Sequence, residues 1–255
     1  MTFPNFLSLL LLALPSSADA ANPAVRLLPL VVSRSEQACL PDGRWCVSLS
    51  IPEGDSDQRL PIVRAGGVPA TAPQGRPEGS YSKQTEQVWP NLILLPDGGF
   101  LAGIETRTAT SYSGGGGSAT VLQLFRVKPD GDASPAPVLT VPIAAALMIR
   151  ACFSERDQEQ RRGACHDEYD FAARLELAGD GADLPELTYV SQAHAFPRGA
   201  SRFADSTQGP RLKQSDLIRS RDPQCSVSRR FRFDAAAGRY QPDAPLPDCS
   251  AYTDP

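Results

Sequence analysis

Alternation of apolar and polar residues is the clearest pattern in the chain, and it predicts β-strands. From Tyr169 to Leu177 every second residue is apolar, whereas charged or small residues such as Glu168, Asp170 and Arg174 occupy the positions between them. A period of two places each set of side chains on its own face of a strand. This segment is therefore predicted to be an amphipathic strand with one buried face.

Further segments combine apolar runs with turns rich in Pro and Gly. Pro-Asp-Gly begins at Pro41, Pro96 and Pro129, and Asp-Gly favours a tight hairpin turn in which both central residues take positive φ. The alanines of 143–148 could start a short helix, but no long segment has a helical period. We expect about eleven short strands. They lie within 27–32, 39–51, 88–95, 100–106, 121–127 (with both faces buried), 137–141, 149–153, 169–177, 187–196 and 229–241.

These elements predict an all-β fold, an antiparallel meander or sandwich stapled by disulfides. A propeller-like arrangement is the second choice, because Leu94–Gly103 resembles the inner hairpin of a β-propeller blade. Residues 21–255 are expected to form a single β-rich globular domain. A flexible loop is expected at about 66–86, where Gly, Pro, Ser, Thr and Gln are frequent.

The N-terminus has the pattern of a secretory signal peptide. Phe6–Leu14 is a short apolar run that Pro15 ends, and Ala18-Asp19-Ala20 supplies small residues at a cleavage site. We therefore expect residues 1–20 to be removed and the mature protein to be periplasmic or secreted. No segment of the mature chain has the uninterrupted apolar length that a membrane span needs.

The six cysteines fall into three local pairs, all after residue 20. A turn at Asp42-Gly43 would place Cys39 opposite Cys46, and the last pair brackets a predicted hairpin. No pair has the Cys-x-x-Cys spacing of a redox or zinc motif. An exported chain enters an oxidising compartment, so nearest-neighbour disulfides are the favoured interpretation, although other connectivities stay open. The expected pairs are Cys39–Cys46, Cys152–Cys165 and Cys225–Cys249.

Charge and motif content argue against several classes of function. The formal net charge is −4, which gives no electrostatic basis for binding nucleic acid. No motif indicates a metal or a cofactor, and we expect none. The leading hypothesis is a non-catalytic protein that binds an unknown protein or glycan, or that has a structural role. Trp45 and Trp89 could line a carbohydrate or peptide groove, but we expect Trp45 to cover its disulfide hairpin and Trp89 to belong to the core.

Two alternatives rest on particular residues. The first is a hydrolase of envelope material that uses His166 with Asp167 or Glu168, because adjacent carboxylates can raise the pKa of an imidazole that acts as acid or base. No nucleophile motif accompanies them. The second is a protein inhibitor that presents the flexible loop Ser111–Ser118, whose sequence is SYSGGGGS.

Two further expectations concern side-chain exposure. The segment between Cys152 and Cys165 is rich in charge, so all of it, Arg161 included, is expected to lie in solvent. In the C-terminal hairpin, the alternating pattern predicts that Phe231, Phe233 and Tyr240 face the core. Arg230, Arg232 and Asp234 are expected to point outward.

Overall fold

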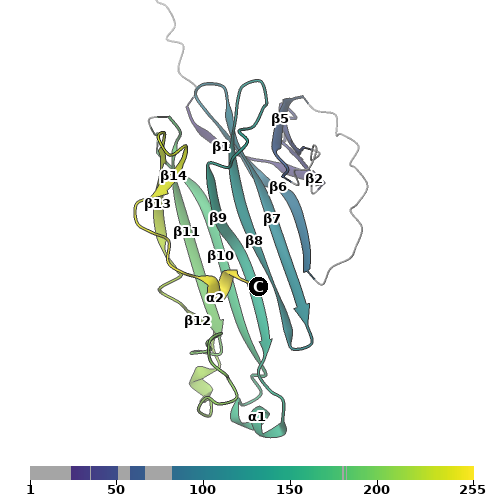
Figure 1. Cartoon of the computed structure of the whole chain (residues 1–255), viewed down its shortest axis with the longest axis vertical. Coiled ribbons are helices and arrows are strands. Elements are labelled where there is room, and N and C mark those ends of the chain that lie inside the picture. The colour runs from purple at the N-terminus through teal and green to yellow at the C-terminus, as the bar shows by residue number, and fades with distance from the viewer. Residues whose placement is uncertain (1–23, 35, 51–57, 67–81, 180, 182) are drawn as a thin grey trace, which may run out of the picture.

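The computed structural model describes residues 24–34, 36–50, 58–66, 82–179, 181 and 183–255 (Figure 1). These residues form a ten-stranded and a four-stranded antiparallel sheet with two short α-helices, and the predicted all-β, antiparallel fold is confirmed. The predicted signal peptide and most of the predicted loop at 66–86 lie outside the described residues. The elements are β1 (Arg26–Pro29), β2 (Val31–Arg34), β3 (Gln37–Cys39), β4 (Trp45–Leu49), β5 (Pro61–Ala65), β6 (Ser82–Leu94), β7 (Phe100–Tyr112), β8 (Gly115–Val127), β9 (Leu139–Arg150), α1 (Glu155–Gln160), β10 (His166–Gly179), β11 (Glu186–Phe196), a 3₁₀ turn (Gln214–Asp216), β12 (Ser220–Arg221), β13 (Ser228–Asp234), β14 (Arg239–Pro242) and α2 (Ser250–Thr253).

The centre of the large sheet is an antiparallel meander in which β6 to β11 pair in chain order. These strands are long, between 11 and 14 residues each, and lie side by side in Figure 1. The prediction of short strands is therefore wrong for this sheet. Residues 82–86, placed in a loop by composition, belong to β6, and 143–148, offered as a helix, belong to β9.

The three Pro-Asp-Gly turns share one geometry. In each turn the glycine N–H donates to the carbonyl of the residue before proline, at 2.9–3.1 Å. The aspartate carboxylate accepts the backbone N–H two residues further on, at 2.9–3.1 Å. Among the described residues of these turns, positive φ occurs only at the glycines Gly43, Gly98 and Gly131. The expectation that both central residues have positive φ is therefore wrong.

Two hydrophobic cores lie on opposite faces of β6–β8. On one face Leu122 and Leu124 join a core with residues of β9 to β14. On the other face Phe125 and Val127 pack with the four-stranded sheet β2–β5, which contributes Val47. Both faces of 121–127 are buried, as predicted. Trp89 is buried, so the prediction of a core role for it is confirmed. Trp45 is half-buried and packs edge-on against Phe100.

The C-terminal strands close over the first of these cores. β9 and β10 pair only from Ala144/Ala172 to Arg150/His166, and beyond this stretch β10 continues beside β11. The Tyr189 hydroxyl of β11 then donates to the Pro142 carbonyl of β9 at 2.8 Å. In the hairpin β13–β14 the predicted faces are confirmed: Phe231 and Tyr240 are buried, Phe233 is half-buried, and Arg230, Arg232 and Asp234 are exposed.

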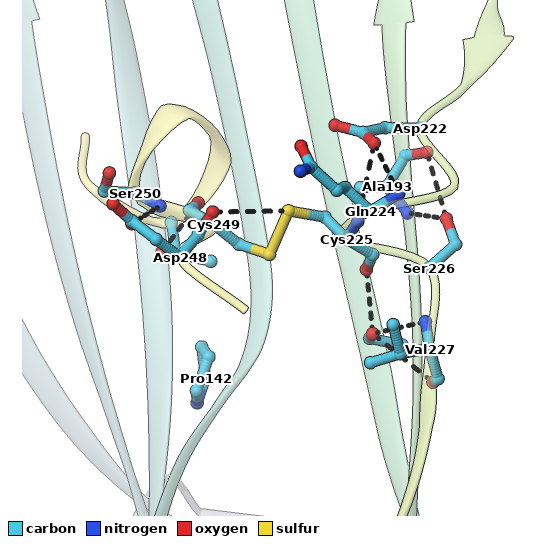
Figure 2. The surroundings of a disulfide bond; sticks show 12 residues. Pro142, Ala193, Asp222, Gln224, Cys225, Ser226, Val227, Asp248, Cys249 and Ser250 are labelled. Carbon is cyan, nitrogen blue, oxygen red and sulfur yellow. Dashed lines mark hydrogen bonds between the residues drawn. A yellow bond between two sulfur atoms is a disulfide. The ribbon is translucent and has the colours of Figure 1, made fainter. Parts of the chain in front are cut away.

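The three predicted disulfides are present, with Cα–Cα distances of 4.0, 4.8 and 5.7 Å. Cys39 and Cys46 are direct partners in the β3–β4 ladder, as the turn predicted. Figure 2 shows how Cys225–Cys249 joins the segment before β13 to the start of α2. Close by, the Ser226 hydroxyl accepts the Ala193 N–H of β11 at 3.0 Å, which fixes the same segment to the sheet.

The glycine run at 111–118 is not a flexible loop, and that prediction is wrong. Tyr112 ends β7, Gly115 begins β8, and these two residues are partners in a regular ladder. A Cβ on Gly115 would stand 2.0 Å from the Met148 carbonyl oxygen, so this position requires glycine for close strand packing. The glycine at this position therefore allows the backbones of β8 and β9 to pack closely in the sheet.

The segment between Cys152 and Cys165 is only partly exposed. It forms α1 and a turn at one end of the large sheet, at the bottom of Figure 1. Most of its charged side chains are exposed, but Arg161 is buried, with 5% of its surface accessible. The prediction for Arg161 is therefore wrong, because its guanidinium meets an internal carboxylate, Asp167. Neither helix of the described chain has the length and apolar character needed to cross a membrane.

Candidate functional site

A groove opens at the α1 end of the large sheet, where β9 ends and β10 begins. It comprises a hollow of about 480 Å³ and a second hollow of about 270 Å³. Cys165 and His166 line both hollows, so the two lie next to each other. The first hollow is lined by Arg150, Cys152, Phe153, Ser154, Glu155, Gln158, Cys165 and His166. The second is lined by Arg162, Gly163, Ala164, Cys165, His166, Glu168, Phe196 and Leu217.

The ends of two strands and a disulfide position the side chains of the groove. Arg150 and His166 are direct partners across β9 and β10, and side chains of such partners lie next to each other on one face. The Cys152–Cys165 bridge closes the connection that carries α1. Ser154 begins this connection as the N-cap of α1, and its hydroxyl accepts the Asp157 N–H at 3.2 Å.

Arg150 and Phe153 are exposed and lie next to each other in the groove. The Arg150 Nε donates to the Cys152 carbonyl at 2.7 Å, and its guanidinium carbon lies 5.2 Å from the centre of the Phe153 ring. The Phe153 side chain remains 65% exposed. Within the described residues, the two terminal nitrogens of Arg150 bind no acceptor and the His166 imidazole makes no hydrogen bond. The groove thus presents uncommitted donors beside an exposed aromatic ring.

The carboxylates proposed as partners of His166 are directed elsewhere. Asp167 follows His166 in β10 and therefore faces the opposite side of the sheet, where it is buried. Glu168 shares the face of His166 but pairs with Arg219, which also pairs with Asp170. The His166–Asp167 pair of the hydrolase hypothesis is not brought together by the fold.

Asp167 instead fastens the α1 connection to the sheet. It accepts hydrogen bonds from the guanidinium of Arg161 and from the hydroxyl of Ser206. Arg161 also donates from Nε to the Ala164 carbonyl at 2.8 Å. The buried Tyr169 phenol lies nearby, and its pKa is raised well above its usual value by burial and by the negative charge of Asp167. Ala164, which accepts the hydrogen bond from Arg161, lines the second hollow, so the polar cluster contacts the wall of the groove.

Other candidates from the sequence lie outside the groove. His194 is half-buried on β11, opposite Asp170. Tyr112 and the glycine run form the end of the β7–β8 hairpin. Across the described ranges, His, Cys, Asp and Glu side chains form no cluster of three or more that could hold a metal ion.

Sequence reasoning found His166 but missed the residues that give the groove its character. Arg150 and Phe153 carry no motif, and they meet His166 only through the β9–β10 register and the short connection after β9. The exposed phenylalanine beside a cysteine was the one available signal, because large apolar side chains on a surface often mark interaction sites. Comparisons with protein-family models, curated proteins and solved structures find no match for this chain.

Proposed function

We propose that this is an exported, non-catalytic binding protein, and that the groove at the α1 end receives its ligand. The observation that carries the proposal is the convergence of Phe153, Arg150 and His166 in one hollow. An exposed aromatic ring and an arginine with free donors are the side chains that most often anchor protein interfaces. The Cys152–Cys165 bridge holds this arrangement before any ligand arrives, which lowers the entropic cost of binding.

Export is supported by the apolar N-terminal segment, the small residues Ala18 and Ala20, and the three disulfides. The compartment we propose is the periplasm or the extracellular medium. Mature protein should therefore begin at Ala21 and contain no free thiol. Intact-mass analysis with thiol labelling tests both points, and a retained N-terminus or a labelled cysteine contradicts export.

The groove supports binding better than either alternative. Hydrolysis would require an acid that acts with His166 and an activated nucleophile. Asp167 faces away, Glu168 lies on the face of His166 but pairs with Arg219, and the Ser154 hydroxyl is engaged as a helix cap. The inhibitor hypothesis requires a projecting loop at 111–118, and those residues pair as strands. The geometry of the groove and of residues 111–118 therefore favours neither the hydrolase nor the inhibitor hypothesis.

The test is affinity capture from an extract of the protein's own compartment. The immobilised mature protein should retain a partner that Phe153→Ala loses. Val31→Ala is the matched control, because Val31 is also exposed, at 59%, but lies on β2 at the opposite end of the molecule (Figure 1). Equal capture by wild type and Phe153→Ala would refute the groove as the binding site.

A further inference from the structure

We infer that the groove recognises an acidic segment of a partner protein, in which a carboxylate side chain neighbours an apolar one. This inference rests on the proposed function and adds the chemistry of the ligand. It follows from three properties of the groove: donors without acceptors, an excess of uncommitted positive charge, and an apolar surface beside that charge.

The first property is the state of the Arg150 guanidinium. Its Nε donates to the Cys152 carbonyl and its plane lies near the Phe153 ring, so the side chain is held in one orientation. Arg150 lines the larger hollow, and its two terminal nitrogens make no hydrogen bond or ion pair with any described residue. A guanidinium fork matches the two oxygens of a carboxylate. Arg150 is therefore a preorganised receptor for a carboxylate.

The second property is the balance of charge around Arg150. His166 stands directly opposite it across the β9–β10 ladder, and Arg162 lines the adjoining hollow. The acids of the groove are Glu155, in the first turn of α1, and Glu168, which pairs with Arg219 and shares it with Asp170. Among the charged side chains that line the groove, Arg150 and Arg162 make no ion pair with a described residue, and the only acid in the same state is Glu155, although the whole chain has a net charge of −4. This surplus of unpaired positive charge favours an anionic partner over a cationic one.

The third property is the apolar surface beside these donors. Phe153 is 65% exposed, and Met148, two residues before Arg150 on the same face of β9, is 44% exposed. A bare inorganic anion would leave both side chains in water. A peptide that carries an acidic and an apolar side chain would cover them and bind Arg150 at once. The larger hollow, about 480 Å³, has the size of a site for a short segment.

The probe for this inference is a fluorescent peptide of alternating Glu and Phe residues, compared with a peptide of alternating Gln and Phe. Anisotropy titrations should show the acidic peptide binding to the intact mature protein at least about tenfold more tightly than its neutral counterpart, with the difference reduced by salt. Arg150→Gln should weaken acidic-peptide binding by about tenfold or more. Glu155→Gln should strengthen it, because it removes the uncommitted acid. Arg239→Gln, an exposed arginine on β14, should leave binding unchanged.

A second variant guards against misfolding. If Arg150→Gln loses the β signature in circular dichroism, Arg150→Lys keeps the charge but lacks the fork, and it should still weaken binding of the acidic peptide. Equal affinity for the two peptides would overturn the inference. So would unchanged binding by the folded Arg150 variant, or tighter binding of an oligogalacturonate, an acidic glycan, than of the acidic peptide.

The two proposals fail separately. If affinity capture depends on Phe153 while the acidic peptide fails to bind, the groove is a binding site for a ligand of other chemistry, and only the inference about the ligand is wrong. If Phe153→Ala captures as wild type does, the proposed function itself falls.

Discussion

Arg161 and Asp167 form a buried ion pair that ties the end of α1 to the beginning of β10. The pair is completed by the Ser206 hydroxyl on Asp167 and by the Ala164 carbonyl on Arg161. The connection that carries Arg161, the start of β10 and the segment that carries Ser206 therefore meet at this buried ion pair. The same connection between Cys152 and Cys165 supplies much of the lining of the groove, and the pair attaches this connection to β10.

Arg161→Ala is expected to lower the free energy of unfolding by about 3–5 kcal/mol, because it leaves the Asp167 carboxylate buried without a cation. Arg156→Ala, an exposed position on the same helix, should change stability by less than about 0.5 kcal/mol. Urea unfolding of the three proteins under oxidising conditions measures the difference. Similar losses of unfolding free energy in the two variants would show that the Arg161–Asp167 pair makes no special contribution to stability.

A double variant distinguishes two contributions to this loss of stability: the lost attraction between Arg161 and Asp167, and the cost of leaving the Asp167 charge buried without a partner. Arg161→Met combined with Asp167→Leu removes both charges and should be more stable than Arg161→Met alone, since replacing a whole buried pair costs less than breaking it. The comparison again uses urea unfolding. If the double variant is the less stable of the two, Asp167 has a stabilising partner other than Arg161.

The C-terminal hairpin should show a sharp contrast between its faces. Phe231 is 3% exposed and packs edge-on against Tyr189, so Phe231→Ala is expected to cost about 3–5 kcal/mol. Arg232→Ala removes only an exposed ion pair with Glu186 and should cost less than about 1 kcal/mol. Thermal or chemical unfolding distinguishes them. An arginine variant as damaging as the phenylalanine variant would contradict the assigned faces.

Loss of the disulfides should follow the length of the chain that each one closes. Cys225–Cys249 spans 24 residues and Cys39–Cys46 spans 7. Chain entropy then gives a loss of about 3.5 kcal/mol for the former and about 2.5 kcal/mol for the latter when both cysteines are replaced by serine. Denaturant midpoints of the two variants test the order. A larger loss at Cys39–Cys46 would mean that local packing outweighs chain entropy.

Glu105 should make the protein less stable as the pH rises. It is buried on β7, and burial raises the pKa of its carboxyl above 4.5 although the Gln87 amide, at 2.6 Å, opposes the change. A raised native pKa means that the folded protein holds the proton longer, so stability falls as the pH rises through that pKa. Glu105→Gln should therefore be more stable than wild type at about pH 7.5 and equal to it at about pH 4.

Urea unfolding at the two pH values measures this effect, with Glu159→Gln on the exposed face of α1 as the control. A gain for Glu105→Gln that persists unchanged at the lower pH would show that desolvation of the charge is not its cause.

Much of the fold could be predicted because local signals agree with tertiary packing. The two-residue period of 169–177 matches the buried Tyr169, Phe171 and Leu175 of β10. The Asp42-Gly43 turn set the register that joins Cys39 to Cys46. In these two places the local sequence determines both the element itself and how it packs or pairs.

The remaining elements depend on partners distant in sequence. The lower parts of β7 and β8 contain Thr, Ser and Gly rather than an apolar alternation, and the regular ladder from Phe100 to Tyr112 extends them. In the sequence, Arg161 resembles the other charged residues of its segment, and only the structure shows that it pairs with the buried Asp167. Arg150 and Phe153 likewise gain meaning only from the register that sets Arg150 opposite His166. The roles of these residues depend on neighbours in the folded structure, which the spacing of residues along the sequence does not indicate.

Site-specific photo-crosslinking can show whether the groove beside Phe153 binds a ligand. A photoreactive phenylalanine analogue would replace Phe153 in one protein and the exposed Val31 in another, and both would be irradiated in the compartment that holds the native protein. We predict a discrete adduct from position 153 that an excess of unlabelled wild type suppresses and that Arg150→Gln diminishes, with no such adduct from position 31. The same adducts from both positions, or an adduct from position 31 alone, would contradict the account.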